Sequence, residues 1–274
     1  MQAVGPIFSR IPIGLQAHCI SIECHIAPGL PGTTIVGLAE GAVKESRDRV
    51  KSALRNNGFN YPNGHVIINL APGNLTKSGT GFDLPIALAI LQASGQVNIP
   101  NRENTEFIGE LGLFGELRAI NGILTCALAS TKANKCLVLP AQNEAEASLV
   151  KDGDLLVAPN LIELIKYLGA KEPNDVRPPM YKAGVVNPVS QPTYGQIIGQ
   201  LNAKSGLLVA AAGGHHLIML GPPGAGKTML ARSFVDLLPA LNDQASLEVA
   251  TIYSSIGLER PNHAAVPFRD PHHS

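Results

Sequence analysis

The octapeptide at residues 221–228, Gly-Pro-Pro-Gly-Ala-Gly-Lys-Thr, matches the pattern GxxxxGK[ST] and constrains the local fold more than any other part of the chain. This pattern forms a glycine-rich turn between a strand and a helix. The apolar run at residues 217–220 predicts a buried parallel strand before the turn. Residues 228–238 repeat apolar side chains at three- and four-residue steps, which predicts a helix after it.

The residue types in this loop suit a bound triphosphate. Gly221, Gly224 and Gly226 allow positive φ and a close approach of the backbone to phosphate oxygens. Amides at the helix start point at the anion, and the helix dipole favours it. Lys227 would reach the β- and γ-phosphates, and the Thr228 hydroxyl would ligate Mg²⁺. A chance glycine-rich turn is disfavoured because Lys227 and Thr228 occupy the last two positions of the pattern. We therefore expect ATP and Mg²⁺ to bind at Gly221, Pro222, Pro223, Gly224, Ala225, Gly226, Lys227 and Thr228.

Composition limits the class of protein. A chain of 274 residues favours two domains, and its 45% hydrophobic content supports two cores. The net charge of +0 gives no global electrostatic signature for nucleic acid, although local basic patches remain possible. The four cysteines and the lack of a signal-peptide pattern favour a cytoplasmic protein with reduced thiols. No uninterrupted apolar stretch reaches about 18 residues, so we expect no membrane association.

The chain divides into two predicted domains. Residues 171–192 contain five prolines among polar neighbours and predict a linker between a domain at 1–170 and another at 193–274. The first domain alternates strands and helices, which indicates an α/β or α+β fold. The predicted strands are 17–26, 33–36, 66–70 and 136–140, the helices are 39–57, 82–93, 123–132 and 161–168, and a hairpin turning at Gly115 covers 106–119.

Other groups of chemically active side chains have simpler structural interpretations. His18, Cys19, Cys24 and His25 could bind zinc, but their spacing is more typical of a strand with alternating faces. Cys126 and Cys136 are expected to be small core residues, and His215 and His216 to pack at the edge of the predicted strand. Arg269, His272 and His273 lie in a loop that either contacts DNA or a neighbouring subunit, or is merely structural. The cations of the predicted helix 39–57 are expected to form a solvated face; they are Lys44, Arg47, Arg49, Lys51 and Arg55.

Short motifs spread over the whole chain form a recognisable set. They include Ala-Pro-Gly-Leu-Pro-Gly at 27–32, Glu-Ser-Arg-Asp-Arg-Val at 45–50, Phe-Asp-Leu-Pro-Ile-Ala-Leu at 82–88, Gly-Glu-Leu-Gly-Leu at 109–113 and Pro-Phe-Arg-Asp-Pro-His-His-Ser at 267–274. Together with the phosphate-binding loop, they resemble the ComM branch of the magnesium-chelatase-like family of AAA+ ATPases.

The resemblance implies a specific fold. It implies an N-terminal Lon-protease-like domain of the ribosomal protein S5 domain 2-like type, also called ChlI-type, followed by the first part of a P-loop AAA+ α/β module. Lon-type peptidases use a Ser-Lys dyad. Here Cys126 falls at the lysine position and an apolar or acidic residue at the serine position, while Ser78 has no base in the pattern. We expect a structural or partner-binding domain, not a peptidase.

The resemblance also frames the function. Members of this branch act as ring ATPases, homo-hexameric in the full-length family, in DNA branch migration during natural transformation and recombination. Hydrolysis needs an acidic pair after a second apolar strand, and residues 229–274 contain no such pattern, nor the sensor and arginine finger that follow it. One interpretation is a truncated fragment that binds nucleotide without hydrolysing it. A magnesium chelatase subunit is the third interpretation, disfavoured because the Lon-like domain marks the ComM branch.

Overall fold

The computed structural model describes residues 5–169, 194–258 and 264–270. Contacts divide the chain into two compact units near residue 184, with Thr251–Leu258 grouped with the first unit. The two units are described separately below. The predicted linker at 171–192 lies outside the described residues, so the proposed boundaries at 170 and 193 stay predictions.

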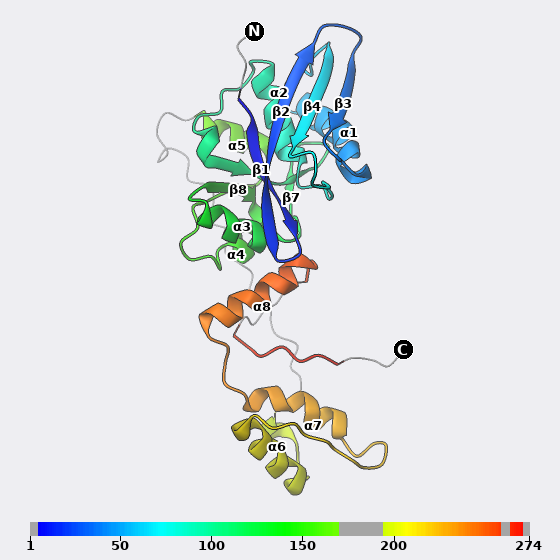
Figure 1. Cartoon of the computed structure of the whole chain (residues 1–274), viewed down its shortest axis with the longest axis vertical. Helices are drawn as coiled ribbons and strands as arrows, with labels where there is room; N and C mark the ends of the chain where they lie inside the picture. The colour runs from blue at the N-terminus through cyan, green and yellow to red at the C-terminus, as the bar shows by residue number, and fades with distance from the viewer. Residues whose placement is uncertain (1–4, 170–193, 259–263, 271–274) are drawn as a thin grey trace. The chain divides into compact units, whose positions relative to one another are not determined.

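The first unit is built on a seven-stranded mixed sheet in the order β3-β4-β2-β1-β5-β8-β9 (Figure 1). The pairs β1–β2 and β2–β4 are antiparallel, and the other four neighbouring pairs are parallel. A short antiparallel ribbon, β6–β7, stands apart from this sheet. The strands are β1 (Ile7–Ile13), β2 (Gln16–Ala27), β3 (Gly32–Val36), β4 (His65–Ala71), β5 (Thr105–Phe107), β6 (Glu110–Leu111), β7 (Leu117–Arg118), β8 (Cys136–Pro140) and β9 (Leu155–Ala158).

The helices of this unit cover the sheet and close its core. The most apolar of them, α2, is buried along nearly its whole length because it packs against β1, β2 and α1. The helices are α1 (Gly41–Asn56), α2 (Asp83–Ala93), α3 (Ile123–Lys132), α4 (Glu144–Ala147) and α5 (Leu161–Leu168). Across the described parts of the chain, no helix is both long and apolar enough to cross a membrane.

Most elements predicted from the sequence of this unit are confirmed. The predicted strands correspond to β2, β3, β4 and β8, and the predicted helices to α1, α2, α3 and α5. The strand interpretation of His18 to His25 is confirmed by β2, and Cys126 is fully buried, as expected of a core residue.

The prediction of one hairpin over residues 106–119 was partly wrong. Residues 105–107 form β5, which pairs in parallel with β8 in the main sheet, because the partners of a short parallel strand are distant in sequence. The hairpin itself is shorter: β6 and β7 pair around Gly115, whose φ is +89°. The position of the turn is therefore confirmed, and the extent of the ribbon is corrected.

A buried polar network explains why β1 was not predicted. Arg10 lies in the middle of this strand, where a charged residue obscures the apolar alternation. Its Nε donates to Glu106 Oε2 of β5 at 2.5 Å and to Ser130 Oγ of α3 at 3.1 Å. Ser130 Oγ donates to the same carboxylate oxygen at 2.6 Å. The charge of Arg10 is thus compensated inside the fold, as burial requires.

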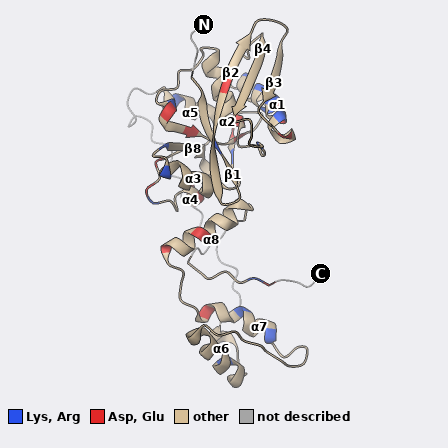
Figure 2. Ribbon diagram, viewed as in Figure 1, with Lys and Arg blue, Asp and Glu red and all other residues tan. Residues whose placement is uncertain are grey.

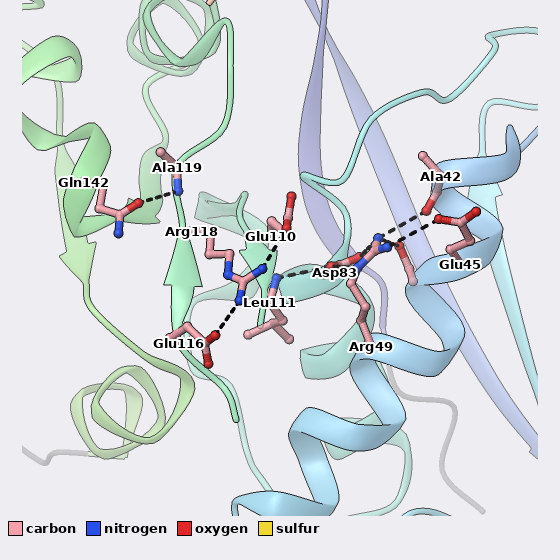
Figure 3. Close-up of polar contacts among 11 residues, drawn as sticks. Ala42, Glu45, Arg49, Asp83, Glu110, Leu111, Glu116, Arg118, Ala119 and Gln142 are labelled. Atoms are coloured by element: carbon pink, nitrogen blue, oxygen red, sulfur yellow. Dashed lines mark hydrogen bonds and ion pairs between the residues drawn. The ribbon is translucent and has the colours of Figure 1, made fainter. Parts of the chain in front are cut away.

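Arg49 corrects the expectation that all cations of α1 are solvated. Its guanidinium donates to both carboxylate oxygens of Asp83, at 2.7 Å and 3.0 Å, and to Ala42 O at 3.2 Å (Figure 3). Asp83 is fully buried at the start of α2, and its Oδ2 also accepts the amide of Leu111 at 3.2 Å. Burial raises the pKa of Asp83, while the hydrogen bonds from Arg49 oppose that shift. This ion pair joins α1, α2 and β6.

The second unit has a small apolar core and no sheet among its described residues. Ile197, Leu207 and Leu230 form this core, with Met219 and Phe234 packed against it. Its helices are α6 (Leu201–Gly213) and α7 (Lys227–Ser233), with a 3-10 segment at Phe234–Leu237 that continues α7, and α8 (Asp243–Ser255) belongs to this unit as far as Ala250. The predicted helix over 228–238 is thereby confirmed in its position, although its last turn is tighter than an α-helix.

The strand predicted at residues 217–220 was wrong for this structure. The segment has no regular secondary structure and pairs with no strand among the described residues, and Ile218 and Leu220 are 84% and 92% exposed. An apolar run becomes a strand only when neighbouring strands satisfy its backbone groups. The described residues of this unit supply none, so only Met219 of the run packs against the small core and its neighbours stay exposed.

We expect Asp83→Ala to destabilise the first unit by about 3 kcal/mol, because it leaves the Arg49 guanidinium without its buried partner. In a domain of this size, the melting temperature should fall by roughly 10 °C. The matched control is Glu45→Ala, since Glu45 also faces Arg49 but at 3.9 Å and largely in solvent; it should change stability by less than about 0.5 kcal/mol. Equal melting temperatures for the two variants would show that the ion pair is not a structural anchor.

Candidate nucleotide-binding loop

The loop at residues 221–228 leads directly into α7. Gly224 and Gly226 have φ values of +80° and +81°, in the left-handed region that favours glycine. Gly226 is the residue before the first turn of α7, and the backbone N–H of Leu230 donates to its carbonyl at 3.0 Å. Gly221 lies outside the left-handed region, so its expected positive φ was wrong. Two of the three glycines therefore shape the turn.

The Lys227 side chain folds back over this loop. Its Nζ donates to Gly221 O and to Pro222 O, each at 2.8 Å. The ammonium group is thus held on the concave side of the turn by two carbonyl oxygens. Phosphate oxygens are stronger acceptors for an ammonium group than neutral carbonyls, so a triphosphate could take over these two bonds. Thr228, which follows Lys227, is exposed.

The segment before α6 is hydrogen-bonded to the loop and to the helical segment that follows it. Gln200 adopts φ +53° and its Nε2 donates to Ala225 O at 3.4 Å. The Tyr194 amide donates to Asp236 at 2.9 Å, which ties this segment to the end of the helix that follows the loop. Lys204 lies over the Tyr194 ring at 4.7 Å. The sequence did not mark these residues as supports, because their partners are distant in sequence.

The histidines near the loop do not occupy the position expected of them. His215 and His216 are exposed and precede an unpaired segment, so their expected packing at a strand edge was wrong. Arg269 is exposed, and the neighbouring Asp270 pairs with Arg232 of α7 at 2.8 Å. His272 and His273 lie outside the described residues. No cluster of three or more metal-ligating side chains occurs where the structure is described.

The peptidase-related positions of the first unit lack an arranged dyad. Ser78 is exposed, and the adjacent Lys77 is fully buried with its Nζ donating to Pro72 O. Burial lowers the pKa of Lys77. Burial also raises the pKa of Cys126 to about 12. The residue that the resemblance places at the lysine position of the dyad is therefore a buried thiol.

Comparisons with known proteins match both halves of the chain to one family. Residues 22–143 match the family model described as "Subunit ChlI of Mg-chelatase", and residues 193–274 match "Magnesium chelatase, subunit ChlI". The competence protein ComM of Haemophilus influenzae is 43% identical over 277 residues, covering 100% of this chain and 54% of that protein. The uncharacterized protein YifB of Escherichia coli is 40% identical over 275 residues, again covering 100% of this chain and 54% of that protein.

A more distant similarity is to a Lon protease. The Lon protease of Wolbachia pipientis is 24% identical over 160 residues, which cover 54% of this chain and 19% of that protein. Together with the mixed α/β architecture, this similarity confirms the expected Lon-like domain and AAA+ module. The chain belongs to the magnesium chelatase-like family that includes ComM and YifB. It spans about half the length of the curated relatives it matches.

Two glycines of the loop give a test of its geometry. Gly224→Ala should weaken nucleotide binding by about tenfold, because a left-handed alanine costs roughly 1–2 kcal/mol. An added Cβ there meets no atom within 4 Å, so the cause would be backbone strain alone. Gly221→Ala is the control, since its Cβ meets only Ala225 Cβ at 3.9 Å and its φ is ordinary. Equal losses in titrations with a fluorescent ATP analogue would contradict this geometry.

Proposed function

We propose that this chain binds ATP with Mg²⁺ through residues 221–228, as part of a ComM-like AAA+ protein. The observation that carries the proposal is the pairing of a left-handed Gly224 and Gly226 with a lysine whose ammonium group faces the turn. Backbone amides at the start of α7 would bind the phosphates. Lys227 would neutralise the β- and γ-phosphates, and Thr228 would ligate Mg²⁺.

The wider role that we propose is DNA branch migration in natural transformation and recombination. The similarity to a protein named competence protein ComM supports it. In this proposal the full-length protein is a cytoplasmic homo-hexamer that converts ATP hydrolysis into movement on DNA. A role as a magnesium chelatase subunit is less consistent with the Lon-like first unit.

A second proposal concerns the polypeptide of residues 1–274 taken alone. Residues 229–274 contain no apolar strand followed by an acidic pair, the feature that organises Mg²⁺ and the attacking water. We therefore expect this polypeptide to bind ATP without measurable turnover. Hydrolysis by residues 1–274 that Lys227→Ala abolishes would rule out this second proposal.

Lys227→Ala tests the proposed site. It should reduce binding of a fluorescent ATP analogue by 100-fold or more, since it removes a charge-assisted contact to two phosphates. Lys132→Ala is the matched control, because that lysine lies in the last turn of α3, in the first unit. Unchanged affinity in the Lys227 variant, with both variants folded by circular dichroism, would refute binding at this loop.

A further inference from the structure

Four cations form a continuous basic stripe along the solvent face of α1. Lys44, Arg47, Lys51 and Arg55 follow one another at steps of three, four and four residues, which places them on one side of the helix. The other side carries buried residues such as Val43 and Val50. The stripe therefore faces solvent along almost the whole helix, and Figure 2 shows Lys and Arg on α1.

Three of these cations have no carboxylate within ion-pair distance among the described residues. Asp48 is the acidic residue on the same face, and its carboxylate pairs with Arg47 at 3.3 Å. Glu45 faces Arg49 at 3.9 Å, outside the stripe. The charges of Lys44, Lys51 and Arg55 are thus left for an external anion.

The spacing of these charges does not stabilise helix α1. Arg47, Lys51 and Arg55 are successive neighbours at i,i+4, where like charges destabilise a helix by about 0.2–0.5 kcal/mol per pair. A face that served only solubility would alternate cations with carboxylates at this spacing. Retaining two repulsive pairs on an exposed face is better explained by binding of a polyanion.

An exposed aromatic side chain lies on the ribbon tip that is bonded to the C-terminal end of α1. Phe114 and Leu113, at the tip of the β6–β7 ribbon, are 77% and 50% exposed. Asn56 Nδ2 donates to Leu113 O at 2.7 Å, and Asn57 Nδ2 donates to Phe114 O at 2.9 Å. The C-terminal end of α1 is therefore hydrogen-bonded to the backbone of the ribbon tip that carries Phe114.

The tip is also fixed from within the ribbon and from α5. The Gly112 amide donates to Glu116 O, the Gly115 amide to Gly112 O, and the Leu161 amide to Gly115 O, at 2.9, 2.9 and 2.8 Å. An exposed phenyl ring in a loop held by this many bonds is preorganised for contact, which limits the entropy lost on binding.

We propose that the basic stripe and Phe114 together bind single-stranded nucleic acid. Cations that follow one another along a helix would contact successive phosphates, and the exposed ring of Phe114, on the ribbon tip that is bonded to the C-terminal end of α1, would stack on a base. Lys51 adds a further aromatic neighbour, since its Nζ lies 5.6 Å from the Tyr61 ring. The inference rests on the proposed role on DNA and assigns one contact surface for it, distinct from the ATP loop.

The test is fluorescence anisotropy of a labelled oligothymidylate titrated with the 274-residue polypeptide. A variant with Lys44→Gln, Lys51→Gln and Arg55→Gln should weaken binding about tenfold or more. It should also reduce the slope of log affinity against log salt by about 2, as expected for three lost phosphate contacts on a single strand. The control carries Lys132→Gln, Lys151→Gln and Lys166→Gln, which change the net charge equally on other elements, and it should bind as the unaltered chain does.

The variant Phe114→Ala tests the contribution of stacking to nucleic-acid binding separately from that of charge. It should weaken binding about fivefold or more and leave the salt slope unchanged, because it removes a stacking partner and no cation. Leu30→Ala is its control, since Leu30 is 88% exposed on the β2–β3 turn and should bind as the unaltered chain does. Equal melting temperatures would confirm that all variants are folded.

Three results would overturn the inference. They are equal losses in the two triple variants, competition by polyglutamate as effective as by the oligothymidylate, and no binding by the unaltered chain. With the first result, the chain still binds DNA and the proposed function stands. With the last, the DNA role fails too, while ATP binding is measured separately through Lys227→Ala.

Discussion

The ion pair between Arg49 and Asp83 is the interaction on which the arrangement of the first unit depends most. It crosses from α1 to the start of α2, and the same carboxylate accepts the amide of Leu111 in β6. The apolar interior alone would allow α1 to slide or rotate on α2. A charge pair that must be satisfied in one geometry removes that freedom. The orientation of α1 then fixes its basic stripe, and the position of β6 fixes the tip that carries Phe114.

Local periodicity was sufficient to predict most elements of this unit. The helix at Ile123–Lys132 and the strand at Cys136–Pro140 carry their own apolar patterns and end at clear turn residues. The sequence did not reveal β1, because Arg10 interrupts its alternation and its compensating partner Glu106 lies 96 residues away. The expectation that Arg49 faces solvent was wrong for the same reason, because its partner Asp83 lies 34 residues away in the sequence.

The candidate site shows which part of a phosphate-binding motif is encoded locally. The left-handed conformations at Gly224 and Gly226, and the lysine bonds across the turn, need only the residues of the loop itself. The apolar run at 217–220 would form a strand only beside neighbouring strands. The described residues of the second unit contain none, so the predicted strand is not formed. Sequence therefore identified the chemistry of the loop better than its structural surroundings.

We propose that residues 221–228 form a preshaped nucleotide site, in a chain whose most stable structure is the sheet of the first unit. Hydrogen–deuterium exchange with and without Mg-ATP tests both parts at once. We expect slow exchange in β1, β2 and β4 whether or not ATP is present, fast exchange at 217–220, and ATP-dependent slowing confined to the loop and the first turn of α7. Slowing by ATP in the strands of the first unit, or none at residues 221–228, would contradict the account.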